Sequence, residues 1–528
     1  MADLVARGNN NTGSNNGSSG PSSGHGGGHG GGGGGSYHRR PYQQRDQQRG
    51  GHSSRYNSNA PKQYSVPSHV PADCFRMYDI RGIVGEGGIT PDLAYALGLA
   101  IGTVAFDLGE SEMIMGRDGR LSGAELAEAL SQGLRDTGMD VIYIGQVPTP
   151  LVYFATYRLT TRSGVMVTAS HNPGNHNGFK IVLAGVTLQS DGIQELLQHI
   201  VQKKFIRCAQ RGRQVTEYVF DDYLKYVTEQ IRLARPLRIV VDAGNGASSD
   251  MAPKVYRALG CEVIPLYCEM DGRFPNHHPD PSVPENLKDL IARVQEERAD
   301  LGLAFDGDGD RVGVVTSTGE IIWPDRQMIL YAMDALRRRP HAEVIFDVKC
   351  SRHLPEAIAS HGGKPVMWRT GHSLIKAKLF ESGAVLAGEM SGHIFFRDEW
   401  FGFDDGIYVG ARLLQILAAD SRTPQAVFDS IPNSVSTPEL KVPLEEARKF
   451  DFVTQLCAKT DWGKDATLVT IDGVRVEYPD GWGLVRASNT SPCLTVRFEA
   501  DSEAAMQRIQ TIFRAVLQKA DKYLQLPF

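Results

Sequence analysis

The chain has 528 residues, of which 41% are hydrophobic and 22% charged, so it can bury several cores and is expected to form three or four domains. Its formal net charge of -5 gives no overall electrostatic case for a nucleic acid or an anionic membrane surface as a partner. No apolar run of about 18 residues and no secretory leader is found, so neither membrane insertion nor secretion is indicated. Seven scattered cysteines without a CxxC pair are typical of reduced thiols, and we expect a cytoplasmic protein.

Residues 1–70 are rich in Gly, Ser, Asn, Gln and His and contain almost no clustered aliphatic side chains. Such a segment cannot bury enough apolar surface to offset the entropy of ordering, so we expect a disordered tail. Arginines and tyrosines that alternate between residues 37 and 56 leave an RNA-binding or partner-binding tail as the alternative. The preferred interpretation is a solvated extension that is dispensable for chemistry.

From residue 71 onward, short β-branched runs alternate with amphipathic stretches in four blocks, 71–216, 217–320, 321–432 and 433–528. Thr90, followed by proline, predicts the start of a helix. The expected strands are residues 113–115, 141–144, 237–241, 301–305, 344–346, 385–387, 467–471 and 494–498, and a helix is expected at 502–521. Strands that alternate with helices favour mixed or parallel sheets covered by helices, so the predicted fold class is α/β.

The first block contains a candidate nucleophile. Residues 168–173 read Thr-Ala-Ser-His-Asn-Pro, where a β-rich run stops and a glycine-containing loop begins. Ser170 on such a loop is exposed enough to carry a phosphoryl group, and His171 and Lys180 can supply protons and positive charge nearby. The alternative is an ordinary Ser/Asn/Pro turn whose hydroxyl bonds its own backbone.

The second block contains a candidate metal site. Asp306, Asp308 and Asp310 alternate with glycines directly after an apolar run, and three carboxylate oxygens in a loop suit Mg²⁺. A calcium-binding EF-hand would need glycine at Arg311 and glutamate at Ser317, and both are missing. A phosphatase of the HAD type, with a nucleophilic aspartate, and a solvated acidic turn are the remaining alternatives.

The third block offers a carboxylate, a hydroxyl and an imidazole within residues 388–393, which read Gly-Glu-Met-Ser-Gly-His. Glu389 and Ser391 can bond vicinal sugar hydroxyls, and His393 can act as an acid or base near neutral pH. The alternative is a glycine-bounded turn with a satisfied histidine.

The fourth block offers a candidate phosphate clamp. Arg486 is followed by Ser488, Asn489 and Thr490, and a guanidinium with successive hydroxyl and amide donors suits a dianionic phosphate. The alternative is a polar loop that bonds only its own backbone.

Two further patterns are weaker. The glycines of residues 241–246 lack the third glycine of a dinucleotide fingerprint and no Walker lysine follows, so we interpret them as a strand-to-helix turn. Arg117 and Arg120, on either side of Asp118, are expected to form an ion-pair network that supports the first block, although either can also face a phosphate.

The four motifs stand in one order, one to a block, and in that order they closely resemble the α-D-phosphohexomutase superfamily, in particular its bacterial phosphomannomutase/phosphoglucomutase group. The resemblance runs from Phe75 to the C-terminus and omits only the tail. It implies four domains around a central cleft, of which the first three are related mixed-sheet α/β domains and the last is a smaller α+β domain. The four blocks would then carry, in order, the phosphoserine, metal-binding, sugar-binding and phosphate-binding loops.

The resemblance also implies the roles of individual residues. Ser170 resembles the phosphorylated serine, which would ligate Mg²⁺ together with the three aspartates. Lys180 and His393 are the preferred acid and base candidates. The candidate catalytic residues are Ser170, His171, Lys180, Arg81, Arg311 and His393, and the candidate substrate-binding residues are Tyr78, Lys349, His372, Glu389, Ser391, Arg486, Ser488, Asn489 and Thr490.

The implied activity is the interconversion of hexose 1-phosphate and hexose 6-phosphate, of mannose, glucose or both, through a phosphoserine enzyme and a bisphosphorylated sugar. Mg²⁺ would be the cofactor and glucose 1,6-bisphosphate, or its mannose counterpart, the activator. We expect small-molecule hexose phosphates as partners, no membrane or nucleic acid, and a monomer or weak homodimer. Phosphoglucosamine mutase and a tail-dependent RNA- or partner-binding protein that retains the mutase fold are the alternatives, although residues 388–393 and 175–180 look more like the mannose/glucose group.

Overall fold

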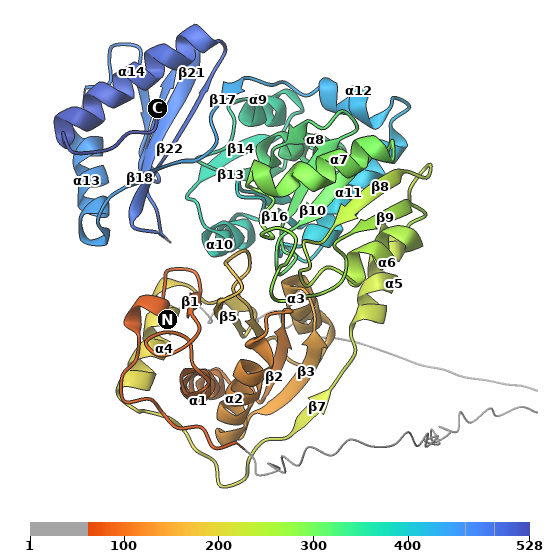
Figure 1. Cartoon of the computed structure of the whole chain (residues 1–528), viewed down its shortest axis with the longest axis vertical. Helices are drawn as coiled ribbons and strands as arrows, with labels where there is room; N and C mark the ends of the chain where they lie inside the picture. The colour runs from red at the N-terminus through yellow and green to blue at the C-terminus, as the bar shows by residue number, and fades with distance from the viewer. Residues whose placement is uncertain (1–61, 460, 490) are drawn as a thin grey trace, which may run out of the picture. The chain divides into compact units, whose positions relative to one another are not determined.

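The computed structural model describes residues 62–459, 461–489 and 491–528 (Figure 1). The predicted tail lies outside the described residues up to Pro61. Residues 62–70, which composition assigns to the tail, lie against helix α1 (Pro91–Asp107). The rings of Tyr64 and Tyr95 have centroids 6.3 Å apart there. The short helix η1 (Ala72–Cys74) follows this segment.

The first sheet has seven strands, ordered β1-β5-β4-β2-β3-β7 with β6 paired to β5. They are β1 (Ile80–Ile83), β2 (Glu112–Arg117), β3 (Asp140–Gln146), β4 (Gly164–Val167), β5 (His176–Leu183), β6 (Val186–Thr187) and β7 (Gln214–Thr216). Strand β2 runs parallel to β3 and β4, whereas β5 is antiparallel to β4 and β1, so the sheet is mixed. The strands predicted at 113–115 and 141–144 are confirmed as β2 and β3.

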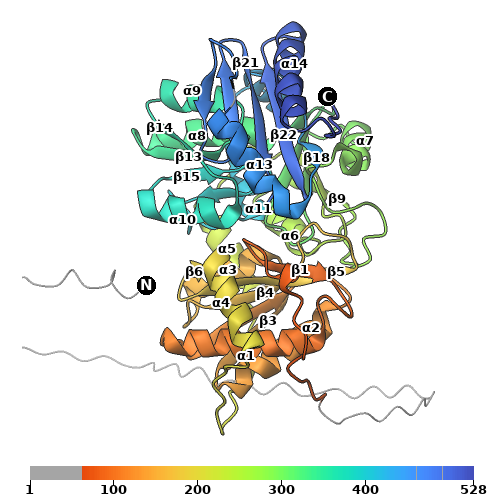
Figure 2. The ribbon, with the colours of Figure 1, turned by 90° about the vertical axis from the view of Figure 1, so that its left-hand side faces the viewer.

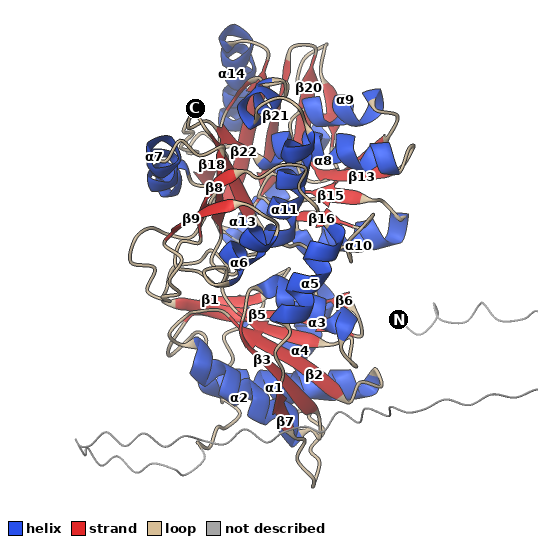
Figure 3. Ribbon diagram, turned by 90° about the vertical axis from the view of Figure 1, so that its right-hand side faces the viewer, coloured by secondary structure: helices blue, strands red, loops and turns tan. Residues whose placement is uncertain are grey.

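Helices cover both faces of the first sheet (Figure 3). Helices α1 (Pro91–Asp107), α2 (Gly123–Asp136) and α4 (Ser190–Val201) share one core with it, and α3 (Thr149–Arg158) belongs to the core on the other face. Thr90 caps α1 as predicted, because its Oγ1 accepts a hydrogen bond from the Leu93 N–H at 3.1 Å.

The second sheet has the strand order β12-β11-β10-β8-β9. Its elements are α5 (Phe220–Gln230), β8 (Arg238–Asp242), α6 (Met251–Ala258), β9 (Glu262–Leu266), η2 (Pro284–Leu287), α7 (Lys288–Glu296), β10 (Leu301–Phe305), β11 (Val312–Thr316) and β12 (Ile321–Ile322). Strand β8 is parallel to β9 and β10, and β11 is antiparallel to β10. The apolar run predicted as a strand at 301–305 is β10 in full.

The third sheet has the order β14-β13-β15-β16. Its elements are α8 (Pro324–Arg338), β13 (Glu343–Asp347), α9 (His353–Ser360), β14 (Lys364–Trp368), α10 (His372–Ser382), β15 (Leu386–Gly388), β16 (Ile394–Phe396), α11 (Gly406–Ala419) and α12 (Pro424–Asp429). Like the second sheet, it has three parallel strands followed by an antiparallel one. Strands β14, β13 and β15 are parallel, and β16 is antiparallel to β15.

The fourth sheet is antiparallel, ordered β17-β22-β21-β20-β19 with β18 paired to β22. Its elements are β17 (Val435–Ser436), β18 (Leu440–Pro443), α13 (Glu446–Lys459), β19 (Thr467–Val469), β20 (Val474–Tyr478), β21 (Gly481–Ala487), β22 (Cys493–Ala500) and α14 (Glu503–Ala520). Both helices share one face and one core (Figure 2). The opposite face places Trp482 and Leu484 against Val348 of the third block. These four sheets confirm the predicted α/β class with a final α+β unit.

Each of the four sequence motifs lies between a strand and its antiparallel neighbour. The serine motif joins β4 to β5, the aspartate loop joins β10 to β11, the Glu-Met-Ser-Gly-His segment joins β15 to β16, and the clamp joins β21 to β22. A bridge between Arg311 and His393 pairs the second of these connections with the third. No helix in the described part of the chain is apolar over a length that could cross a membrane.

Candidate active site

Ser170 stands at the turn after β4 with left-handed backbone, its φ being 49°. This conformation is uncommon for a residue other than glycine. The Ser170 N–H donates to Thr168 Oγ1 at 2.8 Å. Its hydroxyl donates to Asp306 Oδ2 at 2.9 Å, and His171 Nδ1 lies 3.2 Å from the same hydroxyl oxygen. The Ser170 side chain is therefore aimed at the aspartate loop. The prediction that this serine is exposed is wrong, because its turn packs against that loop and buries it.

The aspartate loop brings three buried carboxylates, of Asp306, Asp308 and Asp310, against two cations. Lys180, which β5 carries, donates from Nζ to Asp308 Oδ2 at 2.7 Å and also to Asp310 Oδ2. Arg311 Nε donates to Asp306 Oδ2 at 3.0 Å. Serine, lysine and aspartates thus form one contact network across the first two sheets.

The aspartates fit a divalent cation. One carboxylate oxygen from each of the three aspartates lies within 4.8 Å of the corresponding oxygens of the other two. Oδ1 of Asp308 and Oδ1 of Asp310 are buried and have no hydrogen-bond partner among the described residues. Buried carboxylate oxygens require a partner, and a donor set made only of oxygens suits Mg²⁺. The two unpaired carboxylate oxygens are therefore the observation that supports Mg²⁺ binding by these aspartates.

Burial and charge set the ionisation of this cluster. Burial raises the pKa of Asp306 and of Asp310 to about 7, and repulsion among the carboxylates adds to the effect. Burial would also raise the pKa of Asp308, but the Lys180 ammonium outweighs burial and holds that pKa below its ordinary value. Although burial lowers the pKa of Lys180, its carboxylate partners keep it well above its ordinary value. Lys180 is therefore an ammonium in this arrangement.

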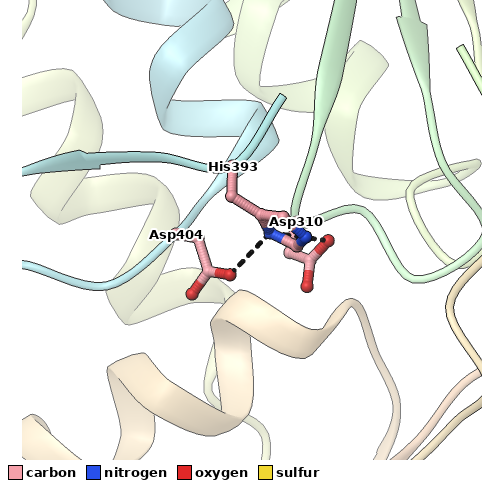
Figure 4. A group of neighbouring side chains, drawn as sticks. All are labelled: Asp310, His393 and Asp404. Carbon is pink, nitrogen blue, oxygen red and sulfur yellow. Dashed lines mark hydrogen bonds and ion pairs between the residues drawn. The ribbon is translucent and has the colours of Figure 1, made fainter. Parts of the chain in front are cut away.

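His393 lies between two carboxylates (Figure 4). Its Nδ1 is 2.9 Å from Asp404 Oδ2 and 3.7 Å from Asp310 Oδ1. Lys376 Nζ is 3.1 Å from the other oxygen of Asp404. Burial would raise the pKa of Asp404, but Lys376 and His393 hold it well below its ordinary value, so this carboxylate is ionised. A carboxylate acceptor at Nδ1 places a proton there and leaves Nε2 of a neutral imidazole as an acceptor.

A row of side chains leads from His393 to the fourth block. The His372 ring stacks on His393 with centroids 5.2 Å apart, and Tyr78 meets His372 edge-on at 5.9 Å. The Tyr78 hydroxyl donates to the Thr370 carbonyl at 2.8 Å and accepts a hydrogen bond from Asn489 Nδ2. Residues of all four motifs are therefore linked by contact.

Two members of the third motif stand beside this row. Glu389 Oε1 accepts the Gly371 N–H at 2.5 Å, and burial raises the pKa of Glu389 to about 7. The Ser391 carbonyl accepts a hydrogen bond from Arg311 Nη1 at 3.2 Å. The third motif is thus anchored on the aspartate loop.

Two cationic side chains, Arg486 and Lys349, lie where the third and fourth blocks meet, and each is paired with a carboxylate. Arg486 Nε donates to Asp472 Oδ2 at 3.0 Å, while its Nη2 is buried without a partner in the described part of the chain. Lys349 Nζ contacts Glu439 Oε1 and lies 3.6 Å from Asp347 Oδ2. An unsatisfied buried guanidinium nitrogen suits an anionic ligand such as phosphate.

The remaining predicted residues have local partners. Arg81 Nη1 donates to Asn172 Oδ1 at 2.8 Å, within the serine turn, residues 168–176, which joins β4 to β5. Ser488 Oγ accepts the Ser491 N–H at 3.2 Å. Burial lowers the pKa of His171 well below its ordinary value, and the Arg311 charge lowers it further, so this imidazole is neutral. Thr490 lies outside the described residues.

Several charged residues of the site carried no signal of their own in the sequence. Asp404 precedes Asp405, whose Oδ1 accepts the Tyr408 N–H at 3.0 Å as the cap of α11. An Asp-Asp-Gly run before an apolar helix predicts such a cap, but not that the first aspartate bonds a histidine. The other residues of this kind are Lys376, Asp347, Glu439 and Asp472.

Family models match four consecutive parts of the chain, all described as phosphoglucomutase/phosphomannomutase. The alpha/beta/alpha domains I, II and III match residues 72–207, 221–319 and 323–435, and the C-terminal domain matches residues 439–516. The matches come in the same order as the four sheets.

Curated and solved proteins agree with these models. A phosphomannomutase/phosphoglucomutase of Pseudomonas aeruginosa is 54% identical over 87% of this chain and 98% of its own length. A phosphoglucomutase of Neisseria gonorrhoeae is 50% identical over 85% of this chain and 97% of its own length. A crystal structure of a phosphoglucomutase/phosphomannomutase family protein from Burkholderia thailandensis, 48% identical, covers 86% of this chain and 99% of its own with a TM-score of 0.82. The chain therefore belongs to the phosphoglucomutase/phosphomannomutase family, as a phosphohexomutase of the bacterial type.

Proposed function

We propose that the protein interconverts hexose 1-phosphate and hexose 6-phosphate by passing a phosphoryl group through Ser170. The observation that carries this proposal is the 2.9 Å contact from Ser170 Oγ to Asp306, inside a buried network that also holds Lys180. A hydroxyl held against paired carboxylates and fixed cations is the arrangement that phosphoryl transfer requires, because such catalysis consists mainly of positioning and charge neutralisation.

Asp306, Asp308 and Asp310 would hold Mg²⁺, with an oxygen of phosphorylated Ser170 as a further ligand. The cation would neutralise charge on the phosphoryl oxygens. Removal of divalent cations with a chelator is expected to abolish turnover, and added Mg²⁺ to restore it.

Proton transfer to and from the sugar hydroxyl has two candidates, Lys180 and His393. The geometry favours His393 as the base, because the Asp404 carboxylate accepts a hydrogen bond from its Nδ1–H and leaves Nε2 to accept a proton. Lys180, held as an ammonium by two carboxylates, serves as fixed positive charge beside the reacting group. Arg81, His171 and Arg311 surround the same serine turn and aspartate loop.

The remaining site residues would bind the substrate. Arg486, with Ser488, Asn489 and Thr490, would grip the phosphate that does not react, supported by the buried unpaired Nη2 of that arginine. Glu389 and Ser391 would read the sugar hydroxyls. Tyr78, His372 and Lys349 would complete the binding surface.

One reactive serine and one fixed clamp impose an order of events. Phosphorylated Ser170 transfers its phosphoryl group to the free hydroxyl of the sugar phosphate, which gives a bisphosphorylated sugar. This intermediate must turn around before its other phosphate can return to Ser170. Glucose 1,6-bisphosphate, or its mannose counterpart, is expected to activate enzyme whose serine is not phosphorylated.

Glucose and mannose differ only at C2, so a loop that binds the other hydroxyls accepts both sugars, and the named relatives act on one or both. We therefore propose dual specificity. We keep the domain limits 71–216, 217–320, 321–432 and 433–528 as part of this proposal, together with a cytoplasmic, monomeric or weakly dimeric enzyme whose tail is not needed for turnover.

The decisive test is Ser170→Ala in a coupled assay with glucose, mannose and glucosamine 1-phosphates. We expect loss of nearly all turnover and of the phosphoryl group detected by intact-mass spectrometry. Ser317→Ala is the matched control and should keep full activity, because the Ser317 hydroxyl donates to Gln425 Oε1 at 2.9 Å, away from the site.

Three results would point elsewhere. Substantial turnover by Ser170→Ala, together with release of free phosphate that depends on Asp306, would indicate a phosphatase. Preferred use of glucosamine 1-phosphate would indicate a phosphoglucosamine mutase. Loss of turnover on deletion of residues 2–61 would give the tail a catalytic role.

A further inference from the structure

Asp118 and Arg120 form a buried ion pair in the loop between β2 and α2. The Arg120 Nε donates to Asp118 Oδ2 at 3.0 Å, and the two side chains are 0% and 1% exposed. A buried ion pair requires that the remaining donors of the guanidinium be satisfied. In this protein the serine turn satisfies them.

The Arg120 guanidinium donates to four backbone carbonyls of the serine turn. Nη2 donates to the carbonyls of Ser170 and Asn172, each at 2.7 Å. Nη1 donates to those of Pro173 at 2.7 Å and His176 at 3.0 Å. Four carbonyl dipoles that converge on one point repel one another unless a cation lies there, so the shape of the turn depends on this guanidinium.

Asp118 holds the same turn from its other side. Its Oδ2 accepts the Thr168 hydroxyl at 2.7 Å, and Thr168 Oγ1 in turn accepts the Ser170 N–H at 2.8 Å. The ion pair is therefore linked to both backbone groups of Ser170. Arg120 bonds the Ser170 carbonyl, and Asp118 is linked to the Ser170 N–H through Thr168. Left-handed backbone at a residue other than glycine is strained, and these bonds offset that strain at Ser170.

A loop of the second block closes the remaining side of the guanidinium. The Phe274 ring lies over Arg120, with its centroid 5.2 Å from Cζ. The backbones pack closely here, since a Cβ on Gly272 would lie 2.4 Å from the Gly119 carbonyl oxygen. A Cβ on Gly174 would lie 2.9 Å from the Gly272 carbonyl oxygen. Arg120 is thus fixed between the serine turn and the second block.

We propose that Arg120 is the positioning residue that holds the Ser170 turn in its reactive conformation, with Asp118 as its partner. This inference rests on the proposed function, because it assigns Arg120 to the phosphoryl-carrying serine. The Arg120 guanidinium bonds Asp118 and the carbonyls of the serine turn, so its effect must pass through the backbone of residues 170–176. A lysine cannot replace it, because one ammonium has three donors and no planar fork.

The test compares Arg120→Lys and Arg120→Gly with the wild-type full chain. We expect kcat for glucose 1-phosphate to fall about a hundredfold in both variants while KM stays within about threefold, because misplacement of a reacting group lowers the rate rather than substrate affinity. Guanidinium chloride at low concentration is expected to restore turnover of Arg120→Gly at least about tenfold, but not that of Arg120→Lys.

Arg117→Lys is the matched control. Arg117 is the last residue of β2, directly before the same loop, and in the described part of the chain it bonds the Tyr143 hydroxyl and the Asp118 carbonyl and none of the carbonyls of the serine turn. It is expected to keep wild-type kcat. Hydrogen exchange supplies a readout that does not need activity: the N–H groups of Ser170, Asn172 and His176 should exchange faster in Arg120→Lys and at the wild-type rate in Arg117→Lys.

Wild-type kcat in Arg120→Lys, unchanged exchange in the turn, or a rise in KM with kcat preserved would each overturn the proposal. The exchange measurement also separates it from the proposed function. If the wild-type protein shows no mutase turnover, the proposed function fails, whereas faster exchange confined to the turn in Arg120→Lys still supports the assigned positioning role.

Discussion

His277 and Asp242 form a pair at the end of β8, outside the site. His277 Nε2 lies 3.0 Å from Asp242 Oδ2, and the Tyr267 ring stands edge-on to the imidazole with centroids 5.5 Å apart. Burial alone would lower the pKa of His277, but the hydrogen bond and charge of Asp242 outweigh burial and raise it above its ordinary value. The pair therefore stabilises the fold through the charged imidazole.

This shift predicts a pH-dependent stability. Because the pKa is higher in the folded state, the stabilisation is fully present below the unfolded value of about 6.5 and is lost as pH rises through the folded value. We expect His277→Gln to lower Tm more at pH 6 than at pH 8.5. His361→Gln is the control, because His361 is exposed and its Nδ1 contacts the Ala357 carbonyl and the Ser360 hydroxyl of its own helix end. An equal loss for His277→Gln at both pH values would contradict the prediction.

At the scale of residues, the sequence predicted side chains that stand in recognisable motifs and missed those that reach the site by folding. Ser170 and Asp306 are 136 positions apart and are nevertheless hydrogen-bonded. Their two motifs each connect a strand to its antiparallel neighbour, in successive sheets. Lys376 projects from α10 onto Asp404, and no local pattern distinguishes that lysine from its solvated neighbours. The ion pair expected between Arg120 and Asp118 is confirmed, whereas Arg117 bonds the Tyr143 hydroxyl and the Asp118 backbone carbonyl instead. The four carbonyl partners of Arg120 depend on a turn that no spacing rule describes.

At the scale of elements, the connections between antiparallel neighbours bring the chemistry together. Gly307, in the aspartate loop, shows how tightly two of them pack, since a Cβ there would lie 2.4 Å from the Ser170 carbonyl oxygen. The Ser170 carbonyl oxygen is a backbone atom that already accepts a hydrogen bond from Arg120 Nη2 at 2.7 Å. It cannot shift away from a Cβ without moving the serine turn. Glycine is required at 307 for this close approach.

Gly307→Ala is therefore expected to separate the serine turn from the aspartate loop. We predict a fall in kcat of at least about tenfold, which is about 1.4 kcal/mol in the barrier, and a lower affinity for Mg²⁺. Gly123→Ala in α2 is the matched control, because its Cβ would have only ordinary contacts, the nearest 3.6 Å from Arg117 Cδ. It should keep activity and gain up to about 1 kcal/mol of stability. Wild-type kcat in Gly307→Ala would show that the two loops adapt independently.

The elements themselves were predicted best where an apolar run is both short and fully buried, as at 301–305. The strand expected at 467–471 ends at Val469, because only its first residues pair with β20. The loop expected after Pro173 contains Gly174 and is short, because β5 begins at His176. Gly178 lies within β5, and a Cβ there would lie 2.1 Å from the Ile80 carbonyl oxygen, so this glycine serves a close strand pairing.

At the scale of the whole described chain, the hydroxyl of Tyr78 ties three blocks together. Tyr78 precedes β1 of the first sheet, its acceptor Thr370 precedes α10 of the third block, and its donor Asn489 belongs to the clamp of the fourth. Burial raises the pKa of Tyr78, and the charge of Arg486 opposes this, so the guanidinium of the clamp stands near the same ring. One neutral hydroxyl thus links the clamp of the fourth block to the backbone that precedes α10 in the third.

Tyr78→Phe keeps the ring and removes both hydrogen bonds, each worth about 0.5–1.5 kcal/mol, and leaves the Thr370 carbonyl and the Asn489 amide without this partner. Because the clamp grips the phosphate that does not react, we expect KM for glucose 1-phosphate to rise about fivefold or more, with a smaller effect on kcat. Tyr95→Phe is the matched control, since its hydroxyl bonds Asp136 at 2.7 Å within the first block alone and KM should not change. A fall in kcat at unchanged KM would instead place the Tyr78 hydroxyl in the chemical step and remove it from the support of the clamp.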